Sequence, residues 1–311
     1  MTTAMPPLRL GTRGSPLALI QTRMVIDALR GKQRNAEEHV IRTTGDAVQD
    51  RRLADIGGKG LFAKEIHDAL VQGRIDAAVH SLKDLETTLP EGVVLACVLP
   101  REDPRDALIL GTTAAVNSAA PFAALPQGAR IGTASVRRQA QLLHVRPDLV
   151  MTTLRGNVGT RLAKLEAGDC TASLLAFAGL KRLGLAARAN AVLDPELMLP
   201  AAGQGIIGVT VRASDTSLRV LLAAIADANS TAAATAERAM LAGLDGSCRT
   251  PIGAYASLQS AGNLCLTGMV ARPDGTFLLK RSITGLVADG ERIGAELAAS
   301  LRSDSPGDIF A

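Results

Sequence analysis

Two stretches of the chain, residues 9–16 and 130–137, follow the same pattern of residue types. Each begins with a short apolar strand, continues through a Gly-Thr pair and ends in small polar residues that suit the first turn of a helix. A strand that leads directly into a helix opens a βαβ unit, so the repeat predicts two α/β lobes of similar plan. The shared pattern is short, and chance similarity is the alternative.

The length and composition narrow the possible classes of protein. A chain of 311 residues is long enough for two or three domains with ample cores. Aromatic residues make up only 2% of the chain and tryptophan is absent, which argues against a single-strand nucleic-acid binder that stacks bases on aromatic rings. The net charge of +4 is too small to indicate binding to DNA or to a membrane surface.

The basic residues are unevenly divided, with 27 arginines against 7 lysines. A guanidinium group can bind a carboxylate or a phosphate through two hydrogen bonds at once, so an excess of arginine is consistent with an anionic ligand. A GC-rich genome, which also raises alanine and glycine, is the alternative explanation for most of this excess.

The cysteines and the N-terminal residues indicate the cellular compartment of the protein. Cys97, Cys170, Cys248 and Cys265 form no CxxC pair, which indicates a reducing compartment and no structural metal. The N-terminus lacks the charged and apolar regions of an export signal, and no stretch approaches the ~20 apolar residues of a membrane span. We therefore expect a cytoplasmic protein.

In the first lobe, the expected helix begins at Pro16 with Ser15 as its N-cap. A second strand is expected at residues 39–43, just before Asp46, and a helix at residues 61–72. The polar segment between them, residues 47–59, is too long for a simple connection and has the composition of a lid. The apolar face of the first helix is predicted to comprise Leu17, Ile20, Met24, Ala28 and Leu29, and that of the second Leu61, Ile66, Ala69 and Leu70.

Residues 76–86 combine a buried strand with a polar cluster. The apolar run 77–79 is typical of a parallel strand, and His80, Ser81, Lys83 and Asp84 follow it. Ligands of open α/β sheets bind beyond the carboxyl ends of the strands, so this cluster is a candidate site. Asp84 is the candidate acid/base residue, and the neighbouring Lys83 would help to keep it ionised. A solvated loop between a strand and a helix is the alternative.

In the second lobe, arginines gather at strand ends and helix starts. One strand is expected to end before residue 155, and another covers residues 172–178. One surface arginine means little, but several at such positions in one lobe suggest a substrate with several carboxylates. The five arginines are Arg137, Arg138, Arg155, Arg161 and Arg182.

Two segments, residues 100–105 and 200–205, have the composition of hinges, and the second includes Gln204.

The last part of the chain changes character. An alanine-rich helix is expected at 231–244, and three strands at 252–258, 264–271 and 276–283 precede a closing helix at 290–301. This pattern predicts a small α+β domain with an antiparallel sheet. Cys248 falls in a loop between Gly246 and Pro251, which is not a core position, although a buried thiol is the usual interpretation of a cysteine.

Nine blocks of the sequence can be compared with a known family. The blocks are residues 11–18, 57–62, 79–84, 101–106, 137–139, 154–158, 179–183, 203–205, and 246–248 with 251–254. Any one block is weak evidence, whereas nine in order are specific. In this order they resemble the porphobilinogen deaminase family, and the resemblance covers essentially the whole chain.

The resemblance implies a fold and a domain organisation. It implies two α/β lobes like those of type II periplasmic binding proteins, followed by a small α+β domain with a three-stranded antiparallel sheet. The implied boundaries are residues 1–105 with 205–224 for the first domain, 106–204 for the second and 225–311 for the third.

The resemblance also implies an activity. Members of the family are transferases that join four porphobilinogen molecules head to tail, with release of ammonia, to make the linear tetrapyrrole hydroxymethylbilane for haem biosynthesis. They prime the chain on a dipyrromethane cofactor held by a thioether bond to a cysteine, which here corresponds to Cys248. The acid/base residue corresponds to Asp84. No metal, nucleic acid or membrane is implied, and the state implied is a monomer.

The resemblance also implies the remaining site residues, which are carried over one by one. The positions implied to bind the cofactor, besides Cys248, are Asp46, Ser81, Lys83, Thr133, Ser135, Arg137, Arg138 and Arg155. The positions implied to bind substrate are Arg13, Lys59, Phe62, Arg155, Arg161, Arg182 and Gln204.

The chain departs from the family pattern at two places. Glu86 and Thr87 stand where the family usually has a proline, and Ala134 removes one hydroxyl group from the second helix start. We expect activity to be retained and affinity or cofactor position to differ.

Two other classes of protein are alternatives. A solute-binding protein would need neither Asp84 nor the Cys248 loop, and an arginine-rich nucleic-acid binder would bind with a steep salt dependence.

Overall fold

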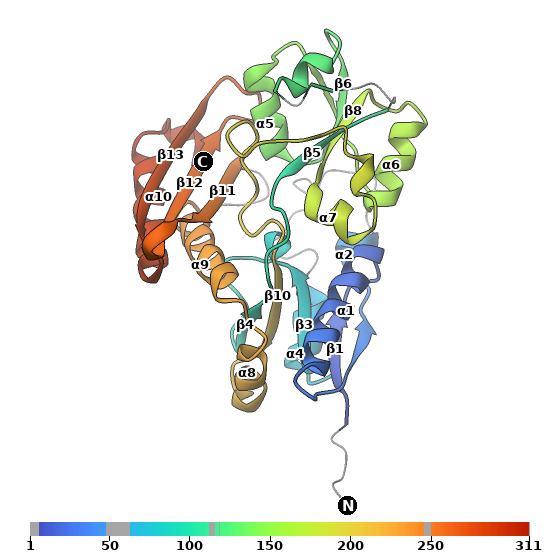
Figure 1. Ribbon diagram of the computed structural model, residues 1–311, viewed down its shortest axis with the longest axis vertical. Coiled ribbons are helices and arrows are strands. Elements are labelled where there is room, and N and C mark those ends of the chain that lie inside the picture. The colour runs from blue at the N-terminus through green and yellow to red at the C-terminus, as the bar shows by residue number, and fades with distance from the viewer. Residues whose placement is uncertain (1–5, 48–62, 112–115, 118, 246–249, 311) are drawn as a thin grey trace, which may run out of the picture. The chain divides into compact units, whose positions relative to one another are not determined.

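The computed structural model describes residues 6–47, 63–111, 116–117, 119–245 and 250–310 (Figure 1). This part of the chain divides into two compact units. The first is built from the chain up to residue 47, from 63–101 and from 206–231, and the second from 102–205 and 232–310. The division into three domains, which would split the second unit, stays a prediction.

A five-stranded sheet organises the first unit. β1 (Leu8–Thr12) lies between β2 (Ala36–Val40) and β3 (Ala77–Ser81), and all three are parallel. β10 (Ile207–Arg212) pairs antiparallel with β3 on one side and with β4 (Val93–Val98) on the other. The strand order is therefore β2-β1-β3-β10-β4.

Four helices described in this unit are α1 (Pro16–Arg30), α2 (Thr44–Ala47), α4 (Lys64–Val71) and α8 (Thr216–Ala223). As predicted, α1 begins at Pro16, and the Ser15 side chain caps it by accepting a hydrogen bond from the backbone N–H of Ala18. The predicted inward face of the second helix is confirmed for Ile66, Ala69 and Leu70, which are buried on α4.

The predicted apolar face of α1 is correct only in part: Leu29 is buried and Ala28 packs against the core, but polar residues of the helix are buried as well. The buried residues are Gln21, Thr22, Val25 and Leu29, whereas Met24 is 39% exposed. Thr22 can be buried because its hydroxyl group donates a hydrogen bond to the backbone oxygen of Ala18, and Gln21 because its amide bonds a side chain of β3. The helix therefore turns a partly polar face to the sheet.

The second strand was predicted at residues 39–43 but spans Ala36–Val40. Its limits follow from its pairing with β1, which places Leu8 opposite Ala36 and Thr12 opposite Val40. The strand lies at the edge of the sheet and is largely exposed, so burial left no clear hydrophobic pattern in its sequence.

A second five-stranded sheet lies in the second unit. β6 (Arg130–Gly132) lies between β7 (Val150–Thr152) and β8 (Ala172–Ala176) in parallel. β5 (Asp106–Leu110) pairs antiparallel with β8 and with β9 (Ala191–Val192). The order β7-β6-β8-β5-β9 repeats the plan of the first sheet, with one antiparallel strand in the fourth position. The prediction of two α/β lobes of similar plan is confirmed.

The repeated Gly-Thr pair has the same packing role in both sheets. A Cβ atom at Gly11 would lie 2.3 Å from Cδ1 of Ile75, and one at Gly132 would lie 2.6 Å from Sγ of Cys170. Each glycine therefore lets its strand pack closely against a neighbouring side chain. The following Thr12 and Thr133 are both buried.

The helices of the second lobe follow its strands. They are α5 (Val136–Val145), α6 (Val158–Glu166) and α7 (Phe177–Arg182). The N-caps of α5 and α6 are Ser135 and Asn157, whose side chains each accept a backbone N–H from the first turn.

The C-terminal part of the second unit contains the predicted antiparallel sheet. Its strands are β11 (Ile252–Leu258), β12 (Asn263–Ala271) and β13 (Leu278–Leu286), in that order. α9 (Ala228–Gly243) and α10 (Gly290–Ser303) supply core residues such as Met240 and Leu297, which pack with those of the sheet. The predicted fold class, including the three-stranded sheet, is confirmed.

Short 3-10 turns complete the described structure. They are η1 (Leu82–Asp84), η2 (Pro121–Ala124), η3 (Ala186–Arg188), η4 (Ser260–Gly262), η5 (Val287–Asp289) and η6 (Gly307–Phe310). Among the helices that the structure describes, none is both long enough and apolar enough to cross a bilayer.

Candidate active site

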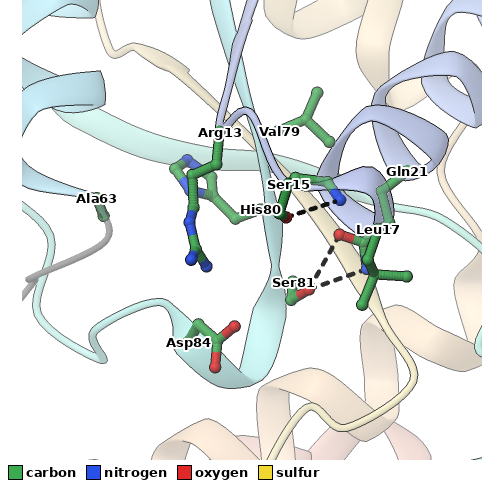
Figure 2. Close-up of a pocket in the computed structure, with 10 residues that line it drawn as sticks. Arg13, Ser15, Leu17, Gln21, Ala63, Val79, His80, Ser81 and Asp84 are labelled. Atoms are coloured by element: carbon green, nitrogen blue, oxygen red, sulfur yellow. Dashed lines mark hydrogen bonds between the residues drawn. The ribbon is translucent and has the colours of Figure 1, made fainter. Parts of the chain in front are cut away.

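A pocket lies at the carboxyl end of β3 in the first unit (Figure 2). It is bounded by the loop after β1, the first turns of α1 and the end of β3. This is the edge of the sheet where α/β proteins bind ligands. The polar residues that line it are Arg13, Ser15, Gln21, His80, Ser81 and Asp84.

Asp84 is the last residue of η1, and buried leucines hold that turn on both sides. Leu82 and Leu85 are buried, the backbone N–H of Leu82 donates to the oxygen of Ile206, and that of Leu85 donates to the oxygen of Leu82. The Asp84 side chain itself is exposed and lines the pocket. The sequence-based candidate therefore stands on a fixed turn with its carboxylate accessible.

Arg13 and Asp84 point into the same space. Figure 2 shows the guanidinium group of Arg13 extending toward the side on which the Asp84 carboxylate lies. Arg13 directly follows β1, and Lys83, next to Asp84, is exposed. A cation and an anion are thus available together at this pocket.

Ser81, a predicted cofactor residue, is held by Gln21. Its Oγ lies 2.9 Å from Nε2 and 3.0 Å from Oε1 of Gln21, which is buried on α1. Gln21 was not among the candidate residues predicted from the sequence. The signal was weak, because an isolated glutamine on an amphipathic helix is normally assigned to its exposed face.

His80 was expected in a polar loop after the strand, but it lies within β3 and is buried. Its Nε2 lies 3.0 Å from Oγ1 of Thr210, and that hydroxyl lies 3.4 Å from Nε2 of His67. Burial, with the charges of His67 and Arg13 adding to it, lowers the pKa of His80 to about 3. The imidazole at this pocket is therefore neutral at neutral pH.

Two of the predicted arginines, Arg137 and Arg138, share one carboxylate in the second unit. Both lie in the first turn of α5 and are buried, as is Asp106 at the start of β5. Nη2 of Arg137 lies 2.7 Å from Oδ2 of Asp106, and Nη2 of Arg138 lies 2.8 Å from Oδ1. Burial alone would raise the pKa of Asp106, but the charges and hydrogen bonds of the two arginines outweigh it and hold that pKa well below its usual range.

Gln204 belongs to the same group. Its Nε2 lies 2.8 Å from Oδ1 of Asp106 and 2.6 Å from the backbone oxygen of Pro104. We call Asp106, Arg137, Arg138 and Gln204 the Asp106 cluster. Asp106 itself was not among the candidate residues, although a charged residue at the head of the apolar run 107–110 is a sign of a buried ion pair.

The other three arginines lie in the second unit, as predicted. Arg155 is buried just beyond β7. Nε of Arg161 on α6 donates to the backbone oxygen of Gly156 at 2.8 Å. Arg182, at the end of α7, donates to the backbone oxygen of Gly205 at 2.7 Å, next to Gln204, and burial lowers its pKa.

Thr133 and Ser135 shape the start of α5. Oγ1 of Thr133 accepts the N–H of Ser135 at 3.1 Å, and Oγ of Ser135 accepts the N–H of Arg138 at 3.4 Å. Both hydroxyl groups therefore position the turn that carries the two buried arginines.

Several predicted residues fall outside what the structure describes. Cys248, Lys59 and Phe62 lie outside the described residues, as does the expected lid apart from Ala47. Asp46 lies in α2, but its side chain is likewise outside the description. The assignments of these residues stay predictions.

Solved structures resemble the chain at low identity. The VFT2 domain of Bordetella pertussis BvgS is 12% identical, with a TM-score of 0.42, and the likeness covers 70% of this chain and 84% of that one. The arginine-specific periplasmic binding protein STM4351 of Salmonella typhimurium is 15% identical with a TM-score of 0.40, covering 71% and 92%.

Curated relatives are much closer in sequence. The chain is 50% identical over 308 residues to the porphobilinogen deaminase of Paracoccus denitrificans, with 98% of this chain and 96% of the relative covered. It is 49% identical over 304 residues to the chloroplastic porphobilinogen deaminase of Oryza sativa, with 94% and 83% covered.

Two family models account for nearly the whole chain. "Porphobilinogen deaminase, dipyromethane cofactor binding domain" matches residues 8–220, and "Porphobilinogen deaminase, C-terminal domain" matches residues 231–303. With these matches and relatives of about half identity along its length, the chain belongs to the porphobilinogen deaminase family.

Proposed function

We propose that this chain joins four porphobilinogen molecules head to tail, with Asp84 as the acid/base residue and Cys248 as the attachment point of a dipyrromethane cofactor. The reaction is that of the family: four porphobilinogen molecules and one water give hydroxymethylbilane and four molecules of ammonia. The observation that carries the assignment of Asp84 is its accessible carboxylate, beside Arg13, in the pocket at the end of β3.

Asp84 can serve each condensation in two ways. Positive charge develops on the substrate pyrrole as ammonia leaves, and a carboxylate fixed beside that charge stabilises it more than water does. The same carboxylate can assist the accompanying proton transfers, which typically contributes ~10²–10⁴-fold in rate. Because η1 is anchored by Leu82 and Leu85, the carboxylate needs little rearrangement before it acts.

The arginines suit the acidic side chains of the substrate. Porphobilinogen carries two carboxylates, so every added unit brings negative charge that a forked guanidinium group can bind. We assign this role to Arg13, Arg155, Arg161 and Arg182, with Lys59, Phe62 and Gln204 as further substrate contacts.

The residues at the start of α5 also fit a dipyrromethane. When bound, this cofactor supplies the pyrrole on which the product chain is built. Nε of Arg138 is buried and has no hydrogen-bond partner among the described residues, so it can still donate to an acidic group. We assign cofactor binding to Arg137, Arg138, Arg155, Ser81, Lys83, Thr133, Ser135 and Asp46.

We infer further that the chain works as a monomer in the cytoplasm and binds neither nucleic acid nor membranes. Its 2% aromatic content and net charge of +4 support the part of this inference that concerns nucleic acid and membranes.

Intact mass tests the cofactor assignment. The wild-type chain should carry a covalent excess equal to one dipyrromethane, and Cys248→Ser should lack it. Cys265→Ser is the matched control, because this free thiol is only half-buried and should leave the excess in place. A wild-type chain of unmodified mass that still makes hydroxymethylbilane would refute the proposal.

A further inference from the structure

The carboxylate of Asp106 is fully buried and receives three side-chain donors within the described part of the chain. Oδ2 accepts from Arg137, and Oδ1 accepts from both Arg138 and Gln204. Hydrogen bonds to an ionised acceptor are the stronger kind, and burial removes the competition of water. Asp106 thereby joins β5, the first turn of α5 and the turn around residue 204.

Each donor of the Asp106 cluster is held at a second point by a backbone oxygen. Nη1 of Arg137 donates to Leu199, Nη1 of Arg138 donates to Leu174 at 2.8 Å, and Nε2 of Gln204 donates to Pro104. A guanidinium group is a rigid plane, so two fixed N–H groups determine where its others point. The directions of the remaining donors therefore depend on Asp106.

The charges within the Asp106 cluster do not balance. Two guanidinium groups face one carboxylate, which leaves one positive charge among four buried side chains. Nε of Arg138, moreover, is buried without an acceptor in the described structure. Unpaired buried charge and unmatched buried donors are both costly, so the arrangement favours one additional anionic group.

We propose that Asp106 is a positioning residue for the cofactor: it orients Arg137 and Arg138 and reduces their combined charge so that they receive a single carboxylate of the dipyrromethane. The inference rests on the proposed role of these arginines. Asp106 itself touches neither the cofactor nor the substrate in this account, and it acts through the two guanidinium groups.

Asp106→Asn and Asp106→Glu disturb the cluster in different ways. Asparagine keeps the shape but removes the charge, and its NH₂ group would face N–H donors of the cluster. Glutamate keeps the charge but moves it by about one carbon–carbon bond in a fully buried site. A charge-assisted contact is typically worth about tenfold or more in affinity. Both changes should therefore weaken cofactor binding through the two arginines and substrate binding through Gln204, which Asp106 also holds, Asn more than Glu.

Asp76→Asn is the matched control. The Asp76 carboxylate also bridges two arginines, at 2.7 Å from Nη2 of Arg9 and 3.9 Å from Nη2 of Arg212. It lies just before β3, at the opposite end of that strand from Asp84, and burial is less complete, with 21% of its side chain exposed. Its replacement should lower the melting temperature without changing ligand binding.

The experiment measures four quantities on each full-length variant: the fraction of chains carrying dipyrromethane by intact mass, KM and kcat per loaded chain, and the melting temperature. We expect Asp106→Asn to load poorly and to raise KM about tenfold or more, with kcat per loaded chain within a few-fold of wild type. Asp106→Glu should give a smaller change in the same direction, and Asp76→Asn none in loading or KM.

A purely structural role would lower the melting temperature of the Asp106 variants while loading and KM stayed at wild-type values, and that result would overturn the proposal. If Asp106→Asn does not fold, Asp106→Glu decides by the same criteria. Failure of the proposed function has a different signature, because the wild-type chain would then lack the covalent excess altogether.

Discussion

Nε2 of His80 on β3 lies 3.0 Å from Oγ1 of Thr210 on the neighbouring strand β10. The same hydroxyl is 3.4 Å from Nε2 of His67, and the two imidazole rings are 5.2 Å apart. Burial, followed by the charges of His67 and Arg13, lowers the pKa of His80 to about 3, and burial also lowers that of His67. The first unit therefore buries two neutral histidines, of which His80 lines the pocket.

Stability should accordingly fall in mild acid. An unfolded histidine binds a proton near pH ~6.5, whereas folded His80 does so only near pH 3, so the unfolded state binds more protons between these values. The free energy of unfolding should therefore decrease by up to ~1.4 kcal/mol for each pH unit lost below ~6.5. Urea denaturation between pH 7 and pH 4.5 measures this slope.

His80→Gln, which keeps a group able to bond Thr210, should flatten that dependence, whereas the same change at the partly exposed His39 should leave it unaltered. An equally steep slope in His80→Gln would assign the acid sensitivity to other groups.

Asp84→Asn should lose nearly all turnover, because it keeps the shape of the side chain and removes the charge that stabilises the transition state. Asp84→Glu should retain a small residual activity, since a displacement on the order of 1 Å can cost ~10²-fold. Both variants should melt like the wild type, because the side chain is exposed. Steady-state turnover and thermal melting are the measurements, with the exposed Glu91→Gln as control. Turnover of Asp84→Asn within a few-fold of wild type would remove Asp84 from the mechanism.

Arg155→Leu should impair cofactor loading or chain elongation while the fold is retained. The reason is that a guanidinium group assigned to carboxylates cannot be replaced by an apolar side chain of similar size. Arg188→Leu is the control, because Arg188 is 38% exposed and pairs with Glu166 in a surface ion pair of small energetic value. Loading measured by intact mass and single-turnover assays would report the effect, and normal values for both would exclude Arg155.

Cys248→Ala should melt at a lower temperature than the loaded wild-type chain. A cofactor that binds only the folded state adds to its stability, and without it the arginines lose their counter-charges. The loaded chain should also give the colour reaction of linked pyrroles with an acidic aldehyde reagent, and the variant should not. Equal melting temperatures together with continued tetrapyrrole synthesis by Cys248→Ala would contradict the attachment.

Local patterns predicted the elements whose signals are short-range. The cap of α1 at Ser15, the limits of β11 and the antiparallel order of the last three strands follow from neighbouring residues, and all three are confirmed. The predicted position of β2 was wrong because β2 is an exposed edge strand, and its limits depend on its pairing with β1.

The candidate site was predictable where sequence motifs carried it. Asp84 and the arginines of the second unit were singled out because their positions were predicted to be strand ends or helix starts. The structure locates all of them there except Arg182, which ends α7. Gln21 was missed because its partner Ser81 is 60 residues away along the chain. The same limit applies to Asp106, whose partners Arg137 and Gln204 are 31 and 98 residues away.

The sequence alone thus determined the two repeated lobes, the small C-terminal sheet and the family, since strand–helix patterns and ordered motifs are written in consecutive residues. The tertiary structure decided which polar side chains are buried together and in which charge state. It made His80 neutral and left Asp106 ionised between two arginines, because burial and the distance to a partner, rather than residue type, control the cost of a charge.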